Sequence, residues 1–215
     1  MIFIVRNSSA INSNMSSFIG IENLEKALRL LAGRLDLARA DPIRLVVCGG
    51  SALIAQGLIT RTTKDVDVLA LADSNGSLIS PAPLPECLLK AVKEVARDLG
   101  LADDWINNGP SSGEGGLFQL GLPEGLADRL DKRVYGPRLT VCFIGRFDQI
   151  HFKLYAAVDR WGGTHLDDLL SLAPSDAELE AAARWAMTHD VSEAFRTILK
   201  DMLRQIGHES VAERI

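Results

Sequence analysis

The segment of residues 43–71 constrains the fold of this chain more than any other part of the sequence. It reads IRLVVCGGSALIAQGLITRTTKDVDVLAL. The β-branched run at 43–48, bounded by Pro42 and by two glycines, predicts a buried strand. Residues 51–57 have the composition of a short helix, and residues 66–71 predict a second strand. The segment therefore predicts a strand, a glycine turn, a short helix and another strand.

Two acidic residues, Asp65 and Asp67, stand at the start of the second predicted strand. Side chains alternate along a strand, so both carboxylates should point to one side, roughly 6–7 Å apart. They repel each other unless a cation lies between them or both face water. Mg²⁺ suits such a pair because it needs one or two carboxylates and takes its other ligands from water and phosphate. Asp-x-Asp alone leaves open that Asp65 caps a turn while Asp67 lies on an exposed face.

The turn before the short helix consists of Gly49, Gly50 and Ser51. Its backbone N–H groups and the following helix N-terminus are suited to hold a phosphate. Glycines also serve only to turn a chain, so the turn is weak evidence by itself. Together with the two aspartates it predicts one site, in which the turn binds a triphosphate and the carboxylates hold a metal ion bound to the same phosphates.

The rest of the chain alternates helical and extended patterns. A helix is predicted at 21–40 and another at 86–99, with Gly100 as C-cap. A third strand is predicted at 139–144, and Asp148 is predicted to cap a helix that runs to Trp161. These patterns predict an α/β (α+β) fold, with a small mixed sheet flanked by helices and a C-terminal helical portion.

Three regions follow from this layout. Residues 1–40 are predicted to form an N-terminal lead-in and helix, residues 41–150 the core, and residues 151–215 the C-terminal helical portion. In the last region Ser175 and Glu178 have the spacing of a capping box. Residues 73–85 and 105–116 are rich in Gly, Ser, Asn and Pro and are predicted to be loops.

Bulk properties exclude several functional classes. The 215 residues have a formal net charge of -5, which gives no basic footprint for duplex DNA. No segment reaches the roughly 18 consecutive apolar residues of a membrane-spanning helix. The three cysteines lack the spacing of a metal site and are expected to be buried and reduced, and the N-terminus lacks a signal-peptide core. A cytoplasmic protein with no membrane partner is therefore expected.

Three stretches carry a resemblance to a known superfamily. The first is GGSALIAQGLITRTTKDVDVL, the second is DWINN at 104–108, and the third is FDQIHFKLYAAVDR followed by LDDLLSL. The chain resembles the nucleotidyltransferase superfamily over residues 43 to about 175. Within it, the closer resemblance is to DUF6036 proteins and to the AbiEii-like abortive-infection toxins.

The resemblance implies a site that binds a nucleoside triphosphate. It places Asp65 and Asp67 on Mg²⁺ or Mn²⁺, and Lys153 at the nucleotide phosphates. Asp168 would complete the catalytic site from the next helix. The remaining residues implied to bind the nucleotide are Gly49, Gly50, Ser51, Arg61 and Lys64.

The implied activity is transfer of a nucleoside monophosphate from an NTP to a tRNA end, a protein or a small molecule. A cognate toxin or antitoxin is an implied partner. The sequence departs from the superfamily in two places, because the third predicted strand has no acidic residue and Ser171 stands where a second acid often follows Asp168. The alternative is therefore a catalytically inactive binding or regulatory module with the same fold.

Overall fold

A computed structural model describes residues 19–113, 115–160 and 163–215 of the chain. The fold is mixed α/β, as predicted, and a six-stranded sheet forms its centre. The strands are β1 (Ile43–Cys48), β2 (Val66–Ala72), β3 (Leu78–Ile79), β4 (Ile106–Asn107), β5 (Asp131–Gly136) and β6 (Leu139–Phe143).

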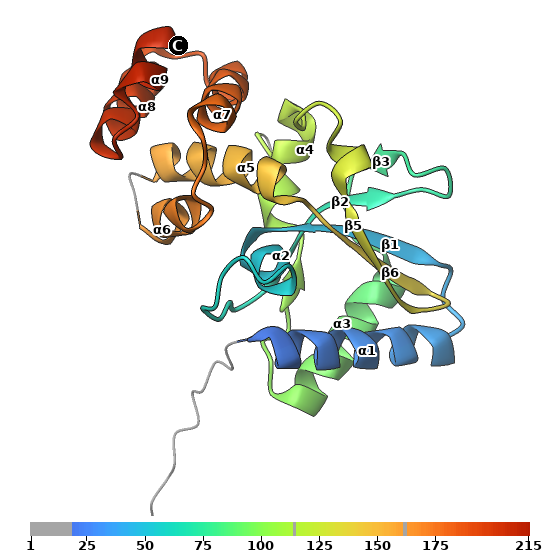
Figure 1. Cartoon of the computed structure of the whole chain (residues 1–215). Helices are drawn as coiled ribbons and strands as arrows, with labels where there is room; N and C mark the ends of the chain where they lie inside the picture. The colour runs from blue at the N-terminus through green and yellow to red at the C-terminus, as the bar shows by residue number, and fades with distance from the viewer. Residues whose placement is uncertain (1–18, 114, 161–162) are drawn as a thin grey trace, which may run out of the picture.

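Helices surround the sheet and make up most of the C-terminal third (Figure 1). The longer ones are α1 (Ile21–Leu37), α3 (Glu86–Leu99), α5 (Arg146–Asp159), α7 (Asp176–His189) and α8 (Glu193–Gln205). The shorter ones are α2 (Gly49–Ala55), α4 (Leu117–Leu120), α6 (Thr164–Ser171), α9 (Glu209–Arg214) and the 3₁₀ turns η1 (Gly109–Ser111) and η2 (Leu126–Arg129).

The sheet order places the predicted site residues at one end of the sheet. Strands lie in the order β3-β2-β1-β6-β5, and β4 pairs with β2. β1 is antiparallel to β2 and parallel to β6, so the C-terminal ends of β1 and β6 lie beside the start of β2. In this register Asp67 pairs with Cys48 on one side and with Asn107 on the other.

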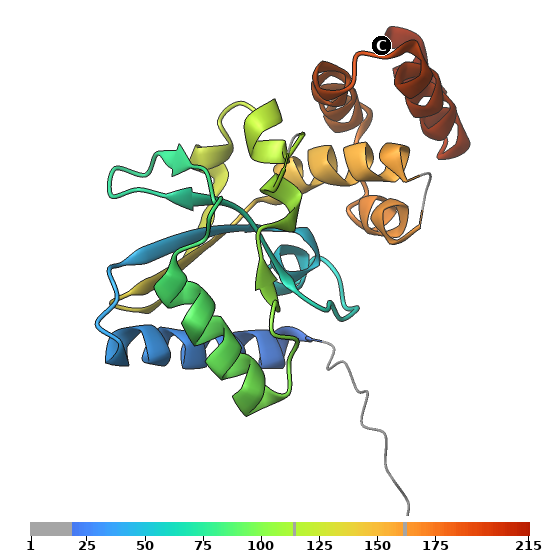
Figure 2. The ribbon, with the colours of Figure 1, turned by 180° about the vertical axis from the view of Figure 1, so that it is seen from behind.

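One face of the sheet packs on α1 and α3 (Figures 1 and 2). Helix α1 contributes Leu24, Leu28, Leu31 and Leu35, whose spacing of three or four residues brings them to one side of the helix. This apolar stripe is the pattern that predicted the helix. The helix ends at Leu37, a few residues before the predicted end.

A separate apolar cluster joins the C-terminal helices. It includes residues of α5, α6, α7, α8 and α9. Helix α5 lies between the sheet and the last helices, and it packs against both α2 and α7 (Figure 2). The predicted boundary at residue 150 falls inside α5, so this helix belongs to both parts of the fold.

Several local predictions are confirmed. Gly100 ends α3 in the left-handed region, with φ of 66°. The capping box of Ser175 and Glu178 is present at the start of α7. The short helix after β1 begins at Gly49, two residues earlier than predicted, and the predicted lead-in at 1–18 and the end of a helix at Trp161 lie outside the described residues.

Other local predictions are wrong. Gly145, not Asp148, is the N-cap of α5. Asp148 is fully buried in the first turn of that helix, where its carboxylate accepts hydrogen bonds from Arg129 at 2.6 and 3.0 Å. Cys87 is exposed, whereas Cys48 and Cys142 are buried as expected. The loops predicted at 73–85 and 105–116 contain β3, β4 and η1.

No helix in the described ranges is both long and apolar enough to cross a membrane.

Candidate active site

A cavity of about 780 Å³ lies at the end of the sheet where β1 ends and β2 begins. Its wall combines the glycine turn, the aspartate pair, the loop around η1 and one face of α5. Polar groups from four segments that are distant in sequence therefore meet in one concave site. Such a cavity is the usual form of a small-molecule site.

The two aspartates face this cavity together. Asp65 immediately precedes β2 and Asp67 is its second residue, and both line the cavity. Val66 and Val68 point to the opposite side and are fully buried in the cluster with α1 and α3. The alternation of side chains predicted this arrangement, and the structure confirms it.

Among the described residues, no basic side chain forms an ion pair with either aspartate, although the charge of Lys153 acts on Asp67. Burial and the neighbouring charge of Asp65 raise the pKa of Asp67 to about 6, against smaller lowering effects from Lys153 and from a hydrogen bond with Asn107. A cation bound between the two carboxylates would remove this repulsion.

The donor set fits a hard divalent cation that shares its ligands with a substrate. In the described part of the chain, no group of three or more His, Cys, Asp or Glu side chains converges on one point. Two carboxylates are nevertheless enough for Mg²⁺, which usually completes its shell with water and substrate phosphate. Asp65 and Asp67 are the residues that would hold it.

Neighbouring side chains approach the turn so closely that only glycine fits at positions 49 and 50. Gly49 has a φ of +72°, and a Cβ there would lie 2.5 Å from Asp67 Oδ2. A Cβ on Gly50 would lie 2.9 Å from Thr63 Oγ1. The backbone of the turn thus lies directly against the acidic segment, and both glycines line the cavity.

Substitution of Gly49 by alanine is expected to destabilise the protein and to weaken Mg²⁺ binding. The left-handed backbone costs alanine about 1–2 kcal/mol, and the added methyl group would displace the Asp67 carboxylate. Gly57→Ala is the matched control, since Gly57 has a φ of +69° with no atom within 4 Å of an added Cβ. Chemical denaturation with and without Mg²⁺ compares them. Equal losses of stability and equal Mg²⁺ responses in the two variants would contradict the predicted contact.

Ser51 and Lys64 are not among the residues that line the cavity. The hydroxyl of Ser51 is fully buried and donates a hydrogen bond to the carbonyl of Cys48 at 3.3 Å. Lys64 is an exposed residue of the segment before β2. The predicted contacts of these two side chains with a nucleotide stay predictions.

Two cations on the cavity wall share one buried carboxylate. Lys153 Nζ donates to Asp168 Oδ2 at 2.7 Å. Arg61 donates to both oxygens of Asp168, at 2.8 and 2.5 Å. Burial alone would raise the pKa of Asp168, but the hydrogen bonds from Arg61 and Lys153 hold it below its ordinary value.

Asp168 therefore lies behind the cations and is not among the residues that line the cavity. It positions Lys153 and Arg61, which do line it. Arg160, the C-cap residue of α5, also borders the cavity. The side chain of Lys153 is only 6% exposed, so an anion partner explains its burial.

Two polar residues of the site escaped sequence reasoning. Asn107 hydrogen-bonds Asp67, and its Oδ1 accepts from the backbone N–H of Gly109 at 2.8 Å. Gln149 lies four residues before Lys153 on the same face of α5 and also lines the cavity. Helical spacing from Lys153 would have pointed to Gln149. Asn107 lies in the DWINN stretch, but β4 is only two residues long, so its pairing with β2 gave no local pattern.

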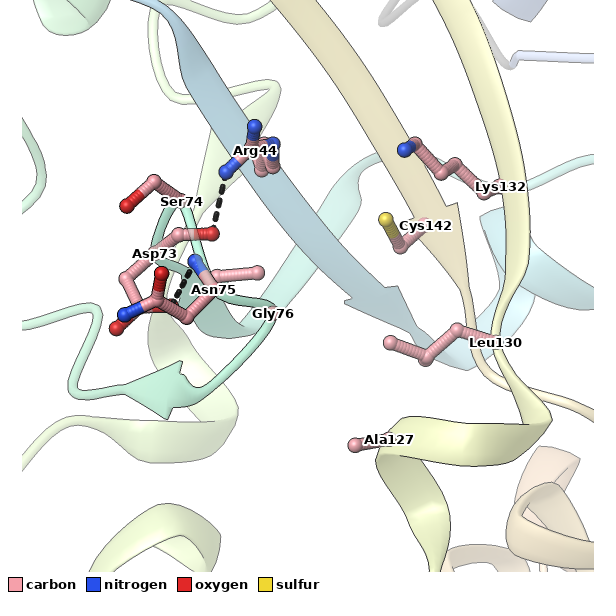
Figure 3. A pocket seen from close by; sticks show the side chains of 10 residues that line it. Arg44, Asp73, Ser74, Asn75, Gly76, Ala127, Leu130, Lys132 and Cys142 are labelled. Carbon is pink, nitrogen blue, oxygen red and sulfur yellow. Dashed lines mark hydrogen bonds between the residues drawn. The ribbon is translucent and has the colours of Figure 1, made fainter.

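A second cavity, of about 320 Å³, lies at the other end of β1 and β2 (Figure 3). Arg44 and Lys132 flank it, and Arg44 hydrogen-bonds the carbonyl of Asp73. It contains neither the glycine turn nor a pair of facing carboxylates. The 780 Å³ cavity is therefore the candidate active site.

The fold and the cavity define a mixed α/β protein in which paired carboxylates lie beside a glycine turn. Residues 23–82 match the family described as nucleotidyltransferase of unknown function (DUF6036). The match includes the glycine turn and both aspartates and ends before α3. Over these residues the chain is similar to a nucleotidyltransferase family of unknown function. Neither the comparison with curated proteins nor the comparison with solved structures gave a match.

Proposed function

We propose that the protein is a Mg²⁺-dependent nucleotidyltransferase that transfers a nucleoside monophosphate from an NTP to an acceptor hydroxyl or phosphate. The observation that supports this most is the pair Asp65 and Asp67, which face a cavity beside the glycine turn and form no ion pair with any described residue. The matched family points to the same chemistry. Mn²⁺ would serve the same two carboxylates.

Acidic and basic residues of the cavity would have different roles in binding the metal and the triphosphate. Asp65 and Asp67 would hold the divalent cation, which would neutralise charge on the triphosphate. Gly49 and Gly50 bring the backbone close to that point, and Lys153 faces the phosphates from α5. Arg61 adds a second positive charge beside Lys153, since both donate to Asp168. Catalysis would come mainly from positioning and charge neutralisation.

In the transfer step, an oxygen of the acceptor forms a bond to the α-phosphorus of the NTP. The bond from that phosphorus to the oxygen bridging to the β-phosphate breaks in line, and pyrophosphate leaves. One of the two aspartates takes the proton of an acceptor hydroxyl. The charges of Lys153 and Arg61 would stabilise the departing pyrophosphate.

A non-catalytic binding or regulatory module is the second candidate. It is favoured by the ion pairs that Lys153 and Arg61 already form with Asp168, and by β6, which has no acidic residue. Such a module would bind a nucleotide or a partner protein without transferring anything.

Incubation with α-³²P-labelled NTPs, Mg²⁺ and total cellular RNA and protein tests the proposal. We expect label in an RNA, protein or small-molecule fraction with wild type, and at least a roughly 100-fold loss with Asp65→Asn or Asp67→Asn. Asp41→Asn, an exposed acid in the loop before β1, is the charge-matched control. Nucleotide binding without transfer would favour the module, and neither binding nor transfer would refute the nucleotidyltransferase.

The sequence resemblance of residues 147–172 to AbiEii-like toxins supports a physiological part of the proposal. In it, the chain is one component of a toxin–antitoxin pair, the acceptor is a tRNA end or a protein, and a cognate antitoxin or toxin binds it. Growth arrest on expression of wild type, absent with Asp67→Asn, is the expected result. Equal growth with both proteins would contradict a toxin role.

A further inference from the structure

Gln149 is a buried polar residue of the cavity. No role was predicted for it from the sequence, and the proposed mechanism gives it none. It lies in the first half of α5, is fully buried, and lines the cavity on the same helix as Lys153. Its Nε2 donates a hydrogen bond to the carbonyl of Gly49 at 3.3 Å. The side chain is therefore anchored to the glycine turn.

The other end of this amide has no partner within the described residues. Gln149 Oε1 is buried and accepts no hydrogen bond there. The orientation of the amide follows from its neighbour, because the Gly49 carbonyl is itself an acceptor and must face the NH₂ group. Native proteins rarely leave a buried acceptor unpaired, and such a group indicates a ligand or a functional role.

Gly49 connects this acceptor to the acidic pair. One side of the residue lies against Asp67, whose Oδ2 would be 2.5 Å from an added Cβ, and its carbonyl lies against the Gln149 amide. Gly49 thus contacts both the Gln149 amide and Asp67, and all three residues line the same cavity. A ligand held by Asp65 and Asp67 would lie within reach of the Gln149 amide.

We propose that Gln149 is a ligand-binding residue whose Oε1 accepts a hydrogen bond from an O–H group of the ligand beside Gly49. The inference rests on the proposed function. The donor is either the hydration shell of a divalent cation on Asp65 and Asp67, or a sugar hydroxyl of the nucleotide. Both present the O–H chemistry that an amide oxygen accepts.

Gln149→Met removes the acceptor and keeps the length of an unbranched side chain. Gln56→Met is the matched control, since Gln56 Nε2 also donates to a backbone carbonyl, that of Ile144, at 2.8 Å, but the residue does not line the cavity. Binding of Mn²⁺ alone is measured by electron paramagnetic resonance. Binding of ATP, 2′-deoxyATP and 3′-deoxyATP with Mg²⁺ is measured by calorimetry.

We expect Gln149→Met to weaken binding by roughly two- to tenfold, while the midpoint of thermal unfolding without ligand does not fall below that of Gln56→Met. A purely structural role predicts the reverse, a lower midpoint with unchanged binding. Weaker binding of Mn²⁺ alone identifies the cation's hydration shell as the donor. A sugar hydroxyl is the donor if Gln149→Met binds ATP more weakly but Mn²⁺ equally well. In that case wild type should bind one of the two deoxynucleotides as weakly as Gln149→Met binds ATP.

Unchanged affinities for Mn²⁺ and ATP, relative to Gln56→Met, would overturn the role of Gln149 and leave the proposed function standing. If wild type binds neither Mn²⁺ nor any nucleotide, the proposed function fails, and this inference fails with it. Should Gln149→Met not fold, Gln149→Asn replaces it. This variant withdraws the amide by one methylene group, and the same outcomes apply.

Discussion

Asp67→Asn is expected to stabilise the ligand-free protein and, at the same time, to remove its response to Mg²⁺. The folded state raises the pKa of this carboxyl from 3.8 to about 6 because the group is buried and lies beside Asp65. The charged form is therefore unfavourable in the fold. At neutral pH, removal of the charge should raise the free energy of unfolding by roughly 1–3 kcal/mol. The Asn oxygen can still accept from Asn107.

The raised pKa of Asp67 also predicts how the stability difference between wild type and Asp67→Asn changes with pH. A raised pKa means that the folded state binds more protons than the unfolded state between about pH 4 and pH 6. Over that range, Asp67 makes wild type lose stability as the pH rises, whereas the variant lacks this contribution. The two proteins should have similar free energies of unfolding below about pH 4 and diverge above it, as measured by urea denaturation at a series of pH values.

Mg²⁺ should reverse the order of stability. A ligand that binds only the folded state stabilises it in proportion to the logarithm of its concentration above the Kd. Wild type should gain stability with Mg²⁺ and NTP, and Asp67→Asn should lose roughly 100-fold or more in metal affinity. Asp41→Asn should match wild type in both tests. A variant less stable than wild type at pH 7 without metal would show that Asp67 is a structural residue.

Asp168→Ala is expected to cause a large loss of stability, about 3–5 kcal/mol. Asp168 is 1% exposed and is the carboxylate bound by Lys153, whose side chain is itself nearly buried. Its removal leaves the Lys153 ammonium in a site from which water is largely excluded. Arg61 loses the same partner, and with it the contact that joins the segment before β2 to α6. Denaturation with urea measures the loss.

The double variant Lys153→Met/Asp168→Leu separates the cost of an unpaired charge from the loss of the pair. It should be clearly more stable than Asp168→Ala, because no buried charge stays unpaired. Pyrophosphate should stabilise Asp168→Ala more than wild type, since it can bind the two released cations. If the single and double variants lose equal stability, then packing at Asp168 matters more than its charge.

Much of the fold followed from local sequence patterns. The apolar stripe of α1, the β-branched run of β1 and the capping box of α7 depend on residues close in sequence. All three are present, although α1 ends at Leu37 and not at residue 40. Strand β5 was not predicted, because it is an edge strand with no regular apolar alternation, and Val134 is 69% exposed. Its place in the sheet comes from pairing with β6.

The sequence by itself determined that Asp65 and Asp67 face the same way and that a glycine turn precedes them, since both follow from backbone periodicity and local sterics. Only the tertiary structure decided what surrounds them. Asp168 holds Lys153 and Arg61, and Gln149 contacts Gly49, across separations of 15, 107 and 100 residues. Such contacts depend on how β1, β2 and α5 pack, and packing is set by the burial of the whole core rather than by any local pattern.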